Sequence, residues 1–292
     1  MINADSRKSR GTELLYMVSR LNQGIQKVKR RHRVRYSVVI LCSLLVVFVL
    51  YRLPRCDPHR FQAGLDLDEK VLLLDTLDAL THVLATANIP FFLIGGTLLG
   101  SWRHHGIVPW DDEVDLMVSI KHKKNVSDLL QQLKPRYVLN EEQKVRWKFY
   151  SSRAQPIGSK TWSFPFVDIN FYHVNDTRLW DDDVHNWSEM NYRKDHVFPL
   201  ASRPFEGRQL PTPYNVVGIL STDIRNLEMC QPNSFSHREE TSVTPCEAVP
   251  CSELYSHYPF VHRSSDGSAG CRETLMLNGT VLRLVVLHDQ VC

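Results

Sequence analysis

Four acidic side chains crowd into the segment W-D-D-E-V-D at residues 110–115, fifteen positions after a Gly-Gly pair. If residues 114–118 form a strand, side chains two positions apart share one face, roughly 6.6 Å apart along the backbone. Glu113 and Asp115 would then repel each other by roughly 2.5 kcal/mol at an effective dielectric of about 20. A divalent cation with oxygen ligands is the simplest way to neutralise such a pair. The segment therefore predicts a metal site.

The flanking sequence predicts the elements that would position these acids. Apolar residues at helical spacing indicate a helix over residues 67–87, and a short apolar run over 91–94 indicates a buried strand. Gly95 and Gly96 then turn the chain into a short helix over 97–104. A helix and two strands are expected downstream, over residues 121–133, 145–151 and 164–174.

The last of these strands carries Asp168 in the middle of the apolar run FPFVDINFYHV. A lone aspartate in an apolar strand is costly to bury unless it is paired or bound to a metal. Asp168 is therefore a candidate third carboxylate for the same site. The alternative is an aspartate satisfied by a neighbouring arginine or a backbone amide.

Charge is distributed unevenly along the 292 residues. The first 35 hold ten Lys and Arg against two acids, although the whole chain has a net charge of only +3. The remainder holds 25 basic and 30 acidic side chains, a net charge of −5. Nucleic-acid binding by the main domain is therefore not supported.

The basic run at residues 27–35 leads directly into an uncharged apolar stretch, a pattern typical of a membrane helix with its positive flank in the cytoplasm. As a helix, residues 36–51 span roughly 24 Å, a little short for a ~30 Å bilayer core. A cleaved signal peptide and a buried core helix are the alternatives, but no A-x-A-like site follows and the stretch is uniformly apolar. We predict a cytoplasmic tail, a transmembrane signal anchor and a stem over residues 1–35, 36–53 and 54–66.

This single-pass type II topology places everything beyond the anchor in the lumen of the Golgi or the ER. Two features agree with it: four N-glycosylation sequons and six cysteines, an even number that fits disulfides in an oxidising compartment. Fifteen pairings are possible, and a bridge through Cys56 would give a homodimer. Zinc binding is the alternative, but the usual Cys spacing for it is missing. The acceptor residues are Asn125, Asn175, Asn186 and Asn278, and the cysteines are Cys56, Cys230, Cys246, Cys251, Cys271 and Cys292.

The lumenal part divides by composition into a catalytic domain over residues 67–225 and a Cys-rich appendage over 226–292. Within the first, the polar stretch 175–195 is expected to loop over the surface, and Glu206-Gly207 to form a β-turn. The appendage shows little periodicity before residue 274 and is expected to be held by disulfides.

A Gly-Gly turn followed by paired acids has a coherent chemistry. Glycines let backbone N–H groups approach an anion closely at a helix N-terminus, and the acids hold a metal that the same anion can bridge. Together they predict a site for phosphoryl transfer.

These residues resemble the signature of the LicD-type phosphotransferases, the family of the bacterial phosphocholine transferases, fukutin and the fukutin-related protein. The resemblance rests on GGTLLG at 95–100, RHHGIVPWDDEVD at 103–115, VDINFY at 167–172 and the segment 198–213. It covers roughly residues 67–220.

The resemblance implies an α/β (α+β) fold of the nucleotidyltransferase type, with a mixed sheet flanked by helices and carboxylates that bind Mg²⁺ or Mn²⁺. It implies transfer of a phospho-alcohol group, such as phosphocholine or ribitol phosphate, from a CDP-linked donor to a hydroxyl of a glycan or glycoprotein acceptor. Two departures stand out: glutamate at position 113, where aspartate is usual, and no cysteine between residues 97 and 228 to match a zinc-binding insertion. The residues that match the family's catalytic acids are Asp111, Glu113, Asp115 and Asp168.

The roles of the surrounding residues are hypotheses. The Gly-Gly turn would receive the donor phosphate, Arg103 would bind phosphate or pair with the acids, His104 would face the site or the surface, and Trp110 would pack, with stacking on a base as the alternative. Asp168 would complete the metal shell or take the acceptor's proton, and Asp112 would face away. The candidate substrate-binding residues are Gly95, Gly96, Thr97, Arg103, His104 and Trp110.

Two competing functions remain open at this stage. One is a catalytically silent relative that binds glycans or scaffolds a partner enzyme, and the other is a nucleotidyltransferase that releases pyrophosphate. Retention of an acid at all four candidate positions favours a transferase.

Overall fold

A computed structural model describes residues 61–186, 190–244, 246–265 and 270–288, together with Arg20 and Ser43. Apart from those two residues and 61–66, the predicted tail, anchor and stem lie outside the described residues, as do Cys56 and Cys292. Among the residues described, no helix is long and apolar enough to cross a membrane.

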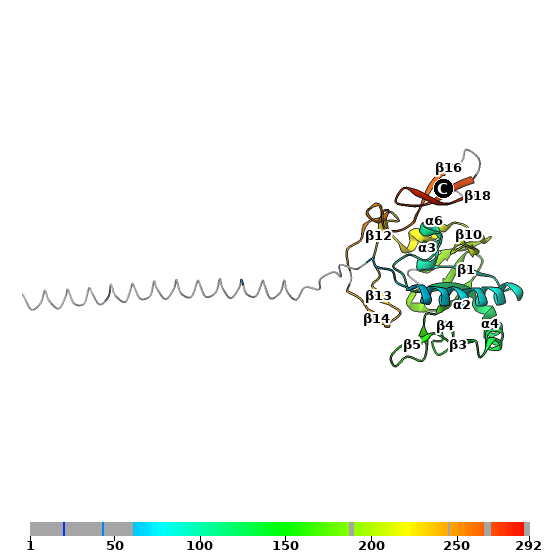
Figure 1. Ribbon diagram of the computed structural model, residues 1–292. Helices are drawn as coiled ribbons and strands as arrows, with labels where there is room; N and C mark the ends of the chain where they lie inside the picture. Colours follow the sequence, from blue (N-terminus) through cyan, green and yellow to red (C-terminus); the bar gives the residue numbers. More distant parts are fainter. Residues whose placement is uncertain are drawn as a thin grey trace, which may run out of the picture. The chain divides into compact units, whose positions relative to one another are not determined.

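A mixed sheet forms the centre of the described structure (Figure 1). Its main path runs β1-β2-β7-β4-β3, and only the central pair β2–β7 is parallel. Two short strands, β8 and β9, continue from β7. This sheet with its helices confirms the predicted mixed α/β class. The strands are β1 (Phe91–Leu93), β2 (Val114–Ser119), β3 (Tyr137–Asn140), β4 (Arg146–Ser151), β7 (Val167–Val174), β8 (Arg178–Asp181) and β9 (Asn191–Arg193).

Helix α2 (Leu67–Thr86) packs against β4 and β7 and supplies much of the core. Asp66 and Glu69 form a capping box that fixes its start. Its inner face is a leucine stripe at helical spacing, which confirms the predicted helix. The fully buried leucines are Leu73, Leu77, Leu80 and Leu84.

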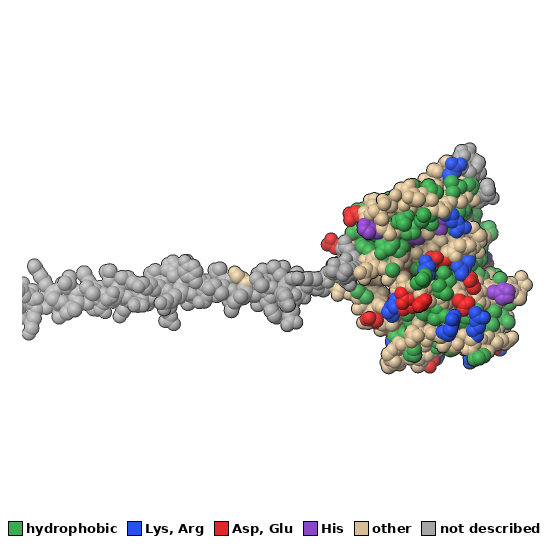
Figure 2. Space-filling view, viewed as in Figure 1, with side chains coloured by type: hydrophobic (Ala, Val, Ile, Leu, Met, Phe, Trp, Pro, Cys, Tyr) green, Lys and Arg blue, Asp and Glu red, His purple; other side chains and the backbone are tan. Residues whose placement is uncertain are grey.

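The outer face of α2 carries several charged side chains that form ion pairs, beside the exposed Leu67 and Val71. Figure 2 shows acidic and basic side chains interleaved over the middle of this face of the molecule. Ion pairs tie the helix to distant segments: Asp75 pairs with Arg136, Asp78 with Arg208, and Glu69 with Arg238. The helix is thereby joined by ion pairs to three segments that follow it at widely spaced points in the chain.

Helix α3 (Gly95–His104) follows β1 directly and contacts β2, as the Gly-Gly turn predicts. The predicted helix over 121–133 is broken into α4 (Lys123–Leu130) between two 3₁₀ turns. Two further short helices, α5 (Lys194–Val197) and α6 (Val216–Asp223), lie near each other, and α6 also contacts α3.

The prediction that residues 175–195 form a surface loop is wrong at residues 178–181 and 191–193. β8 and β9 lie there and bury Leu179 and Tyr192 between polar neighbours. Two buried positions in a polar stretch are too few for a local pattern to reveal. The predicted turn at Glu206-Gly207 is confirmed: both residues have positive φ, 46° and 78°, and they join β10 (Ala201–Phe205) to β11 (Arg208–Thr212).

The C-terminal region belongs to the same compact unit as the central sheet. It carries two small strand pairs and a three-stranded antiparallel sheet, which the sequence did not reveal before residue 274. Cys230 and Cys251 form a disulfide, and Cys246 and Cys271 are also disulfide-bonded, which confirms the predicted oxidised cysteines among those described. The strands are β12 (Met229–Cys230), β13 (Phe235–Ser236), β14 (Thr241–Ser242), β15 (Val249–Pro250), β16 (Phe260–Ser265), β17 (Gly270–Leu277) and β18 (Thr280–His288).

Candidate active site

Three carboxylates meet where β2 and β7 begin. Asp115 and Asp168 are direct register partners in the parallel pair, and Glu113 lies just before β2. One ligand oxygen from each of the three lies within 4.8 Å of the others. The structure thus brings together three of the four acids that the sequence assigned to one site, and the fourth, Asp111, is not in this group.

Basic and amide side chains surround this cluster on the strands beside it. Lys148, opposite Asp168 in β4, places Nζ 3.0 and 3.1 Å from the two Asp168 oxygens. Asn170 donates to Asp115 Oδ1 at 3.1 Å and accepts from Arg146 Nε at 2.8 Å. The sequence analysis gave a paired Asp168 as the alternative to a metal ligand. Asp168 is indeed paired, and its partner is a lysine that the sequence analysis did not identify.

The cluster still carries more negative charge than its neighbours neutralise. Burial, together with the charges of Asp115 and Asp168, raises the pKa of Glu113 well above its usual range. Burial also raises the pKa of Asp168, although Lys148 opposes that shift. A bound cation would offset the burial and the mutual repulsion that raise these pKa values.

The donor set fits a hard divalent cation. All three candidate ligands are carboxylates, and Glu113 Oε2 is buried without an aligned hydrogen-bond donor. Oxygen-only coordination through carboxylates is what Mg²⁺ prefers, and it suits Mn²⁺ as well. Glu113, Asp115 and Asp168 are therefore the residues that would hold it.

The Gly-Gly turn lies directly beside the acids. Gly95 has a φ of 53°, a left-handed conformation that favours glycine. No side chain caps the N-terminus of α3, and the Thr97 hydroxyl accepts a hydrogen bond from the Asp115 amide at 2.8 Å. That bond fixes the start of α3 against the start of β2.

With this geometry in place, comparison with known proteins identifies the domain. Residues 88–215 match the family model described as LicD/FKTN/FKRP, nucleotidyltransferase domain. They form a LicD-type domain. The match begins just before β1 and contains every acid of the cluster.

Several known proteins are similar in sequence to part of this chain. An uncharacterised protein of Rickettsia prowazekii is 28% identical over 157 residues, 52% of this chain and 54% of that protein. Human ribitol 5-phosphate transferase FKRP is 28% identical over 151 residues, 49% of this chain and 29% of that protein. The lipopolysaccharide cholinephosphotransferase LicD of Haemophilus influenzae is 27% identical over 114 residues, 36% and 43% of the two chains. The chain thus spans about half the length, or less, of these relatives.

Among solved structures, lincosamide antibiotic adenylyltransferase LnuA with lincomycin bound is similar at 14% identity and a TM-score of 0.34. It covers 50% of this chain and 83% of that one.

Asp111 lies at the entrance to the LicD-type acid cluster and touches the glycine turn. A Cβ at Gly96 would lie 2.6 Å from Asp111 Oδ2, so a larger residue there would displace the end of the Asp111 side chain. Burial raises the pKa of Asp111 to about 7, and the charges of Asp112 and Asp115 add to the shift. Its carboxylate accepts hydrogen bonds from the Asp112 amide and from Asn233.

Asp112 is not one of the three clustered acids, and it has a partner that the sequence analysis missed. Its carboxylate accepts from His237 Nδ1 at 2.7 Å and from the amides of His237 and Arg238. The opposite ring nitrogen, His237 Nε2, lies 3.1 Å from Glu113 Oε2. Burial lowers the pKa of His237, but Asp112 and the other carboxylates outweigh that effect and raise it.

Three consecutive residues at the end of α3 bind the C-terminal region and do not contact the acid cluster. Arg103 donates to the carbonyls of Leu227 and Met229, and His104 Nδ1 lies 2.6 Å from the carbonyl of Pro259. His105 Nε2 lies 2.8 Å from Glu273. Phosphate binding by Arg103 stays a prediction, and so does a His104 that faces the site. The contacts described above hold the C-terminal region against α3.

Trp110 packs, the first of the two roles expected for it. Its side chain is buried, with its indole N–H donating to the Gln231 carbonyl and edge contacts to Phe61 and Tyr258. This aromatic cluster holds the segment before the acids in place.

A cavity of about 400 Å³ opens beside the glycine turn. Gly96 and Asp111 are among the residues that line it, together with Arg103, Arg225 and Asn226. Apolar side chains make up most of the lining, and the two arginines supply the positive charge that would attract a phosphorylated ligand.

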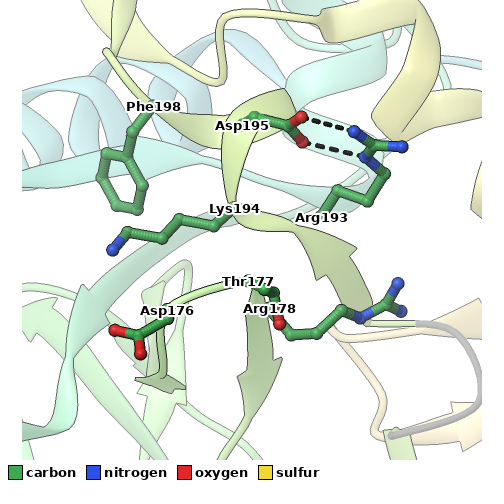
Figure 3. Close-up of a pocket in the computed structure, with 7 residues that line it drawn as sticks. All are labelled: Asp176, Thr177, Arg178, Arg193, Lys194, Asp195 and Phe198. Carbon is green, nitrogen blue, oxygen red and sulfur yellow. Dashed lines mark hydrogen bonds and ion pairs between the residues drawn. The ribbon is translucent and has the colours of Figure 1, made fainter.

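A larger hollow of about 600 Å³ lies elsewhere, at the far end of β7 (Figure 3). Its guanidinium groups are already engaged within the protein: Arg193 pairs with Asp195 and Arg178 binds Asn191. Six residues of strand separate Asp168 from Val174, about 20 Å at ~3.3 Å per residue. We therefore place the chemistry at the acid cluster.

The predicted glycosylation acceptors can be located in part. Asn125 in α4, Asn175 at the β7–β8 turn and Asn278 at the β17–β18 turn are exposed. The side chain of Asn186 lies outside the described residues. Glycosylation stays a prediction.

Proposed function

We propose that this chain is a metal-dependent phosphotransferase that moves a phospho-alcohol group from a CDP-activated donor to a hydroxyl of a glycan. The observation that carries the proposal is the meeting of Glu113, Asp115 and Asp168 beside the Gly95-Gly96 turn. The named activities of two relatives, a ribitol 5-phosphate transferase and a cholinephosphotransferase, support this class of reaction.

In this proposal the protein's groups act by position and charge. The uncapped N-terminus of α3 and the adjoining cavity receive the donor phosphates. The three carboxylates hold Mg²⁺ or Mn²⁺, which supplies Lewis-acid stabilisation of charge on the transferred phosphoryl group. Lys148 fixes the Asp168 carboxylate from its other side, so that it keeps one orientation.

The bond changes define the products. The acceptor oxygen forms a new bond to the phosphorus nearest the alcohol, the bond from that phosphorus to CMP breaks, and a proton leaves the acceptor hydroxyl. CMP is therefore released together with the phosphodiester product. A pyrophosphate-releasing nucleotidyltransferase would instead consume a nucleoside triphosphate.

We place the reaction in the secretory lumen, at a Golgi or ER membrane, with the chain as a single-pass type II protein. The basic flank and apolar stretch of the sequence, the exposed sequons and the Cys230–Cys251 disulfide support this location. Dimerisation through Cys56 is part of the same proposal and can be read from a non-reducing gel of C56S.

One panel separates the candidate functions. The full chain, purified in detergent, is incubated with Mn²⁺ and a series of CDP-linked alcohols plus a mixed glycan acceptor, and CMP and pyrophosphate are measured. We expect CMP from at least one donor. Pyrophosphate release from CTP would favour the nucleotidyltransferase, and no turnover with no calorimetric binding of Mn²⁺ or cytidine nucleotides would favour the scaffold.

A further inference from the structure

The LicD-type match ends at residue 215, yet a histidine beyond it contacts the acid cluster. His237 follows β13 and lies between two carboxylates of the W-D-D-E-V-D segment. Nδ1 is 2.7 Å from Asp112 Oδ1, and Nε2 is 3.1 Å from Glu113 Oε2. One ring thus lies between Asp112, to which it is hydrogen-bonded, and Glu113, a candidate metal ligand that it approaches as an ion-pair partner without hydrogen-bond alignment.

The imidazole is held in one orientation by its surroundings. Asp112 accepts from the His237 backbone amide at 2.9 Å and from the ring, which fixes both the main chain and the side chain. The rings of Phe235 and Phe166 pack around it at centroid distances of 5.0 and 6.1 Å. The ring can therefore constrain Glu113.

The segment that carries His237 is itself anchored to the LicD-type domain. Asn233 donates to the Trp110 carbonyl at 2.8 Å, and Arg238 pairs with Glu69 of α2 and donates to the Gly64 carbonyl. The Cys230–Cys251 disulfide closes the segment behind them. These contacts keep His237 in place.

We propose that His237 is a positioning residue that holds the Glu113 carboxylate toward Asp115 and Asp168, with Asp112 fixing the imidazole. The inference rests on the proposed metal-dependent function and extends it: the C-terminal region completes the metal site. Partners that orient ligands in this way typically change metal affinity 10–100-fold when removed.

The test is Mn²⁺ affinity, measured by electron paramagnetic resonance on the full chain without donor or acceptor. We expect H237A to weaken Mn²⁺ binding roughly tenfold or more, and D112N to weaken it less because the ring remains. H257A, which removes an exposed histidine of the same region, is the matched control and should bind as the wild type does. Far-UV circular dichroism and thermal unfolding check the fold, and H237Q replaces H237A if the latter does not fold.

A double-mutant cycle assigns the effect to Glu113. Once E113Q has removed the carboxylate, adding H237A should change Mn²⁺ affinity little, because the group that His237 positions is gone. Equal losses in both backgrounds, or unchanged affinity in H237A, overturn the inference. Nitrogen coupling from His237 in the Mn²⁺ spectrum also overturns it, since the histidine would then be a ligand. A wild-type chain that binds no Mn²⁺ overturns the proposed function itself.

Discussion

Asp115 and Asp168 are direct partners in the register of the parallel pair β2–β7. Lys148 stands opposite Asp168 on the other side, in the antiparallel pair β4–β7. An acid, an acid and a lysine therefore form one row across three strands. Because a shift of one residue would turn a strand's side chains to the opposite face, the register determines whether these groups meet.

The first prediction concerns this row. D115N should reduce the rate of phosphotransfer by about three orders of magnitude, because the variant lacks a negative charge that would bind the metal. A rate loss of this size corresponds to about 4 kcal/mol in the activation barrier. D128N, which alters an exposed acid of α4, is the control and should retain activity. Secretion and thermal unfolding should match the wild type in both. Turnover within tenfold of wild type in D115N would contradict the metal assignment.

The second prediction concerns protons on the acids. Because the pKa of Glu113 is raised, this carboxyl holds a proton at pH values where a free glutamate has lost it. A metal must displace that proton, so Mn²⁺ affinity should rise as pH increases above the range in which a free glutamate titrates, with proton release on binding. Calorimetry in buffers of different ionisation enthalpy measures the protons released. E113Q should release fewer, and equal release in E113Q would place the protons on another group.

The third prediction tests the contact between the glycine turn and the acids. G96A places a methyl carbon 2.6 Å from Asp111 Oδ2, closer than van der Waals contact allows, so that the carboxylate must move. We expect activity to fall at least tenfold with a small change in melting temperature. If the effect of G96A acts through Asp111, the double variant G96A/D111A should lose no more activity than D111A alone. Additive losses would indicate that Gly96 acts through the bound phosphate.

Much of the site could be predicted from local sequence, and the reason is specific. Asp168 stood out because a charged residue in an apolar strand needs a partner, and the acids at 110–115 were visible as a cluster. Lys148 could not be predicted, because a lysine in an alternating strand is expected to face solvent. In the structure it is buried, with Nζ 3.6 Å from the centre of the Phe166 ring. His237 lies 125 residues from Asp112, and no local pattern reports such a contact.

The last two residues of α3 have partners that local sequence did not reveal. Arg103 and His104 were assigned to substrate because cations close to an acidic motif suit phosphate. The structure places their polar atoms against backbone carbonyls 124 and 155 residues away. A charged residue in a motif indicates that it has a binding partner. Only the tertiary contacts show whether that partner is a ligand or another part of the protein.

The fourth prediction concerns the ion cluster that fastens the C-terminal sheet. Glu273 is fully buried and pairs with Arg203 at 2.5 Å, Arg263 at 2.9 Å and His105 at 2.8 Å. E273Q should destabilise the protein by about 3 kcal/mol, because it leaves buried positive charge without compensation. Urea unfolding at pH 7 measures the loss. D128N removes an exposed pair and should change stability little, and an equally stable E273Q would show that the cluster contributes no net stability.

The fifth prediction uses the pH dependence of His104. Burial lowers its pKa to about 3, against about 6.5 for a free histidine. Between these values the unfolded chain binds a proton that the folded chain does not, so this histidine makes the protein less stable as pH falls from 6.5 toward 3, by about 1.4 kcal/mol per pH unit. Asp111 works in the opposite direction, because its raised pKa favours the protonated folded state below pH 7.

The contribution of His104 must therefore be isolated by difference. H104N keeps a donor for the Pro259 carbonyl but cannot take up a proton. Urea unfolding of the wild type and H104N at pH 7.5, 6 and 5 should show the gap between them changing in favour of the variant as pH falls. Parallel profiles would mean that His104 becomes protonated in the folded protein. In that case the ring must be accessible to water, and the interface between α3 and the C-terminal region would be less tightly packed than its contacts indicate.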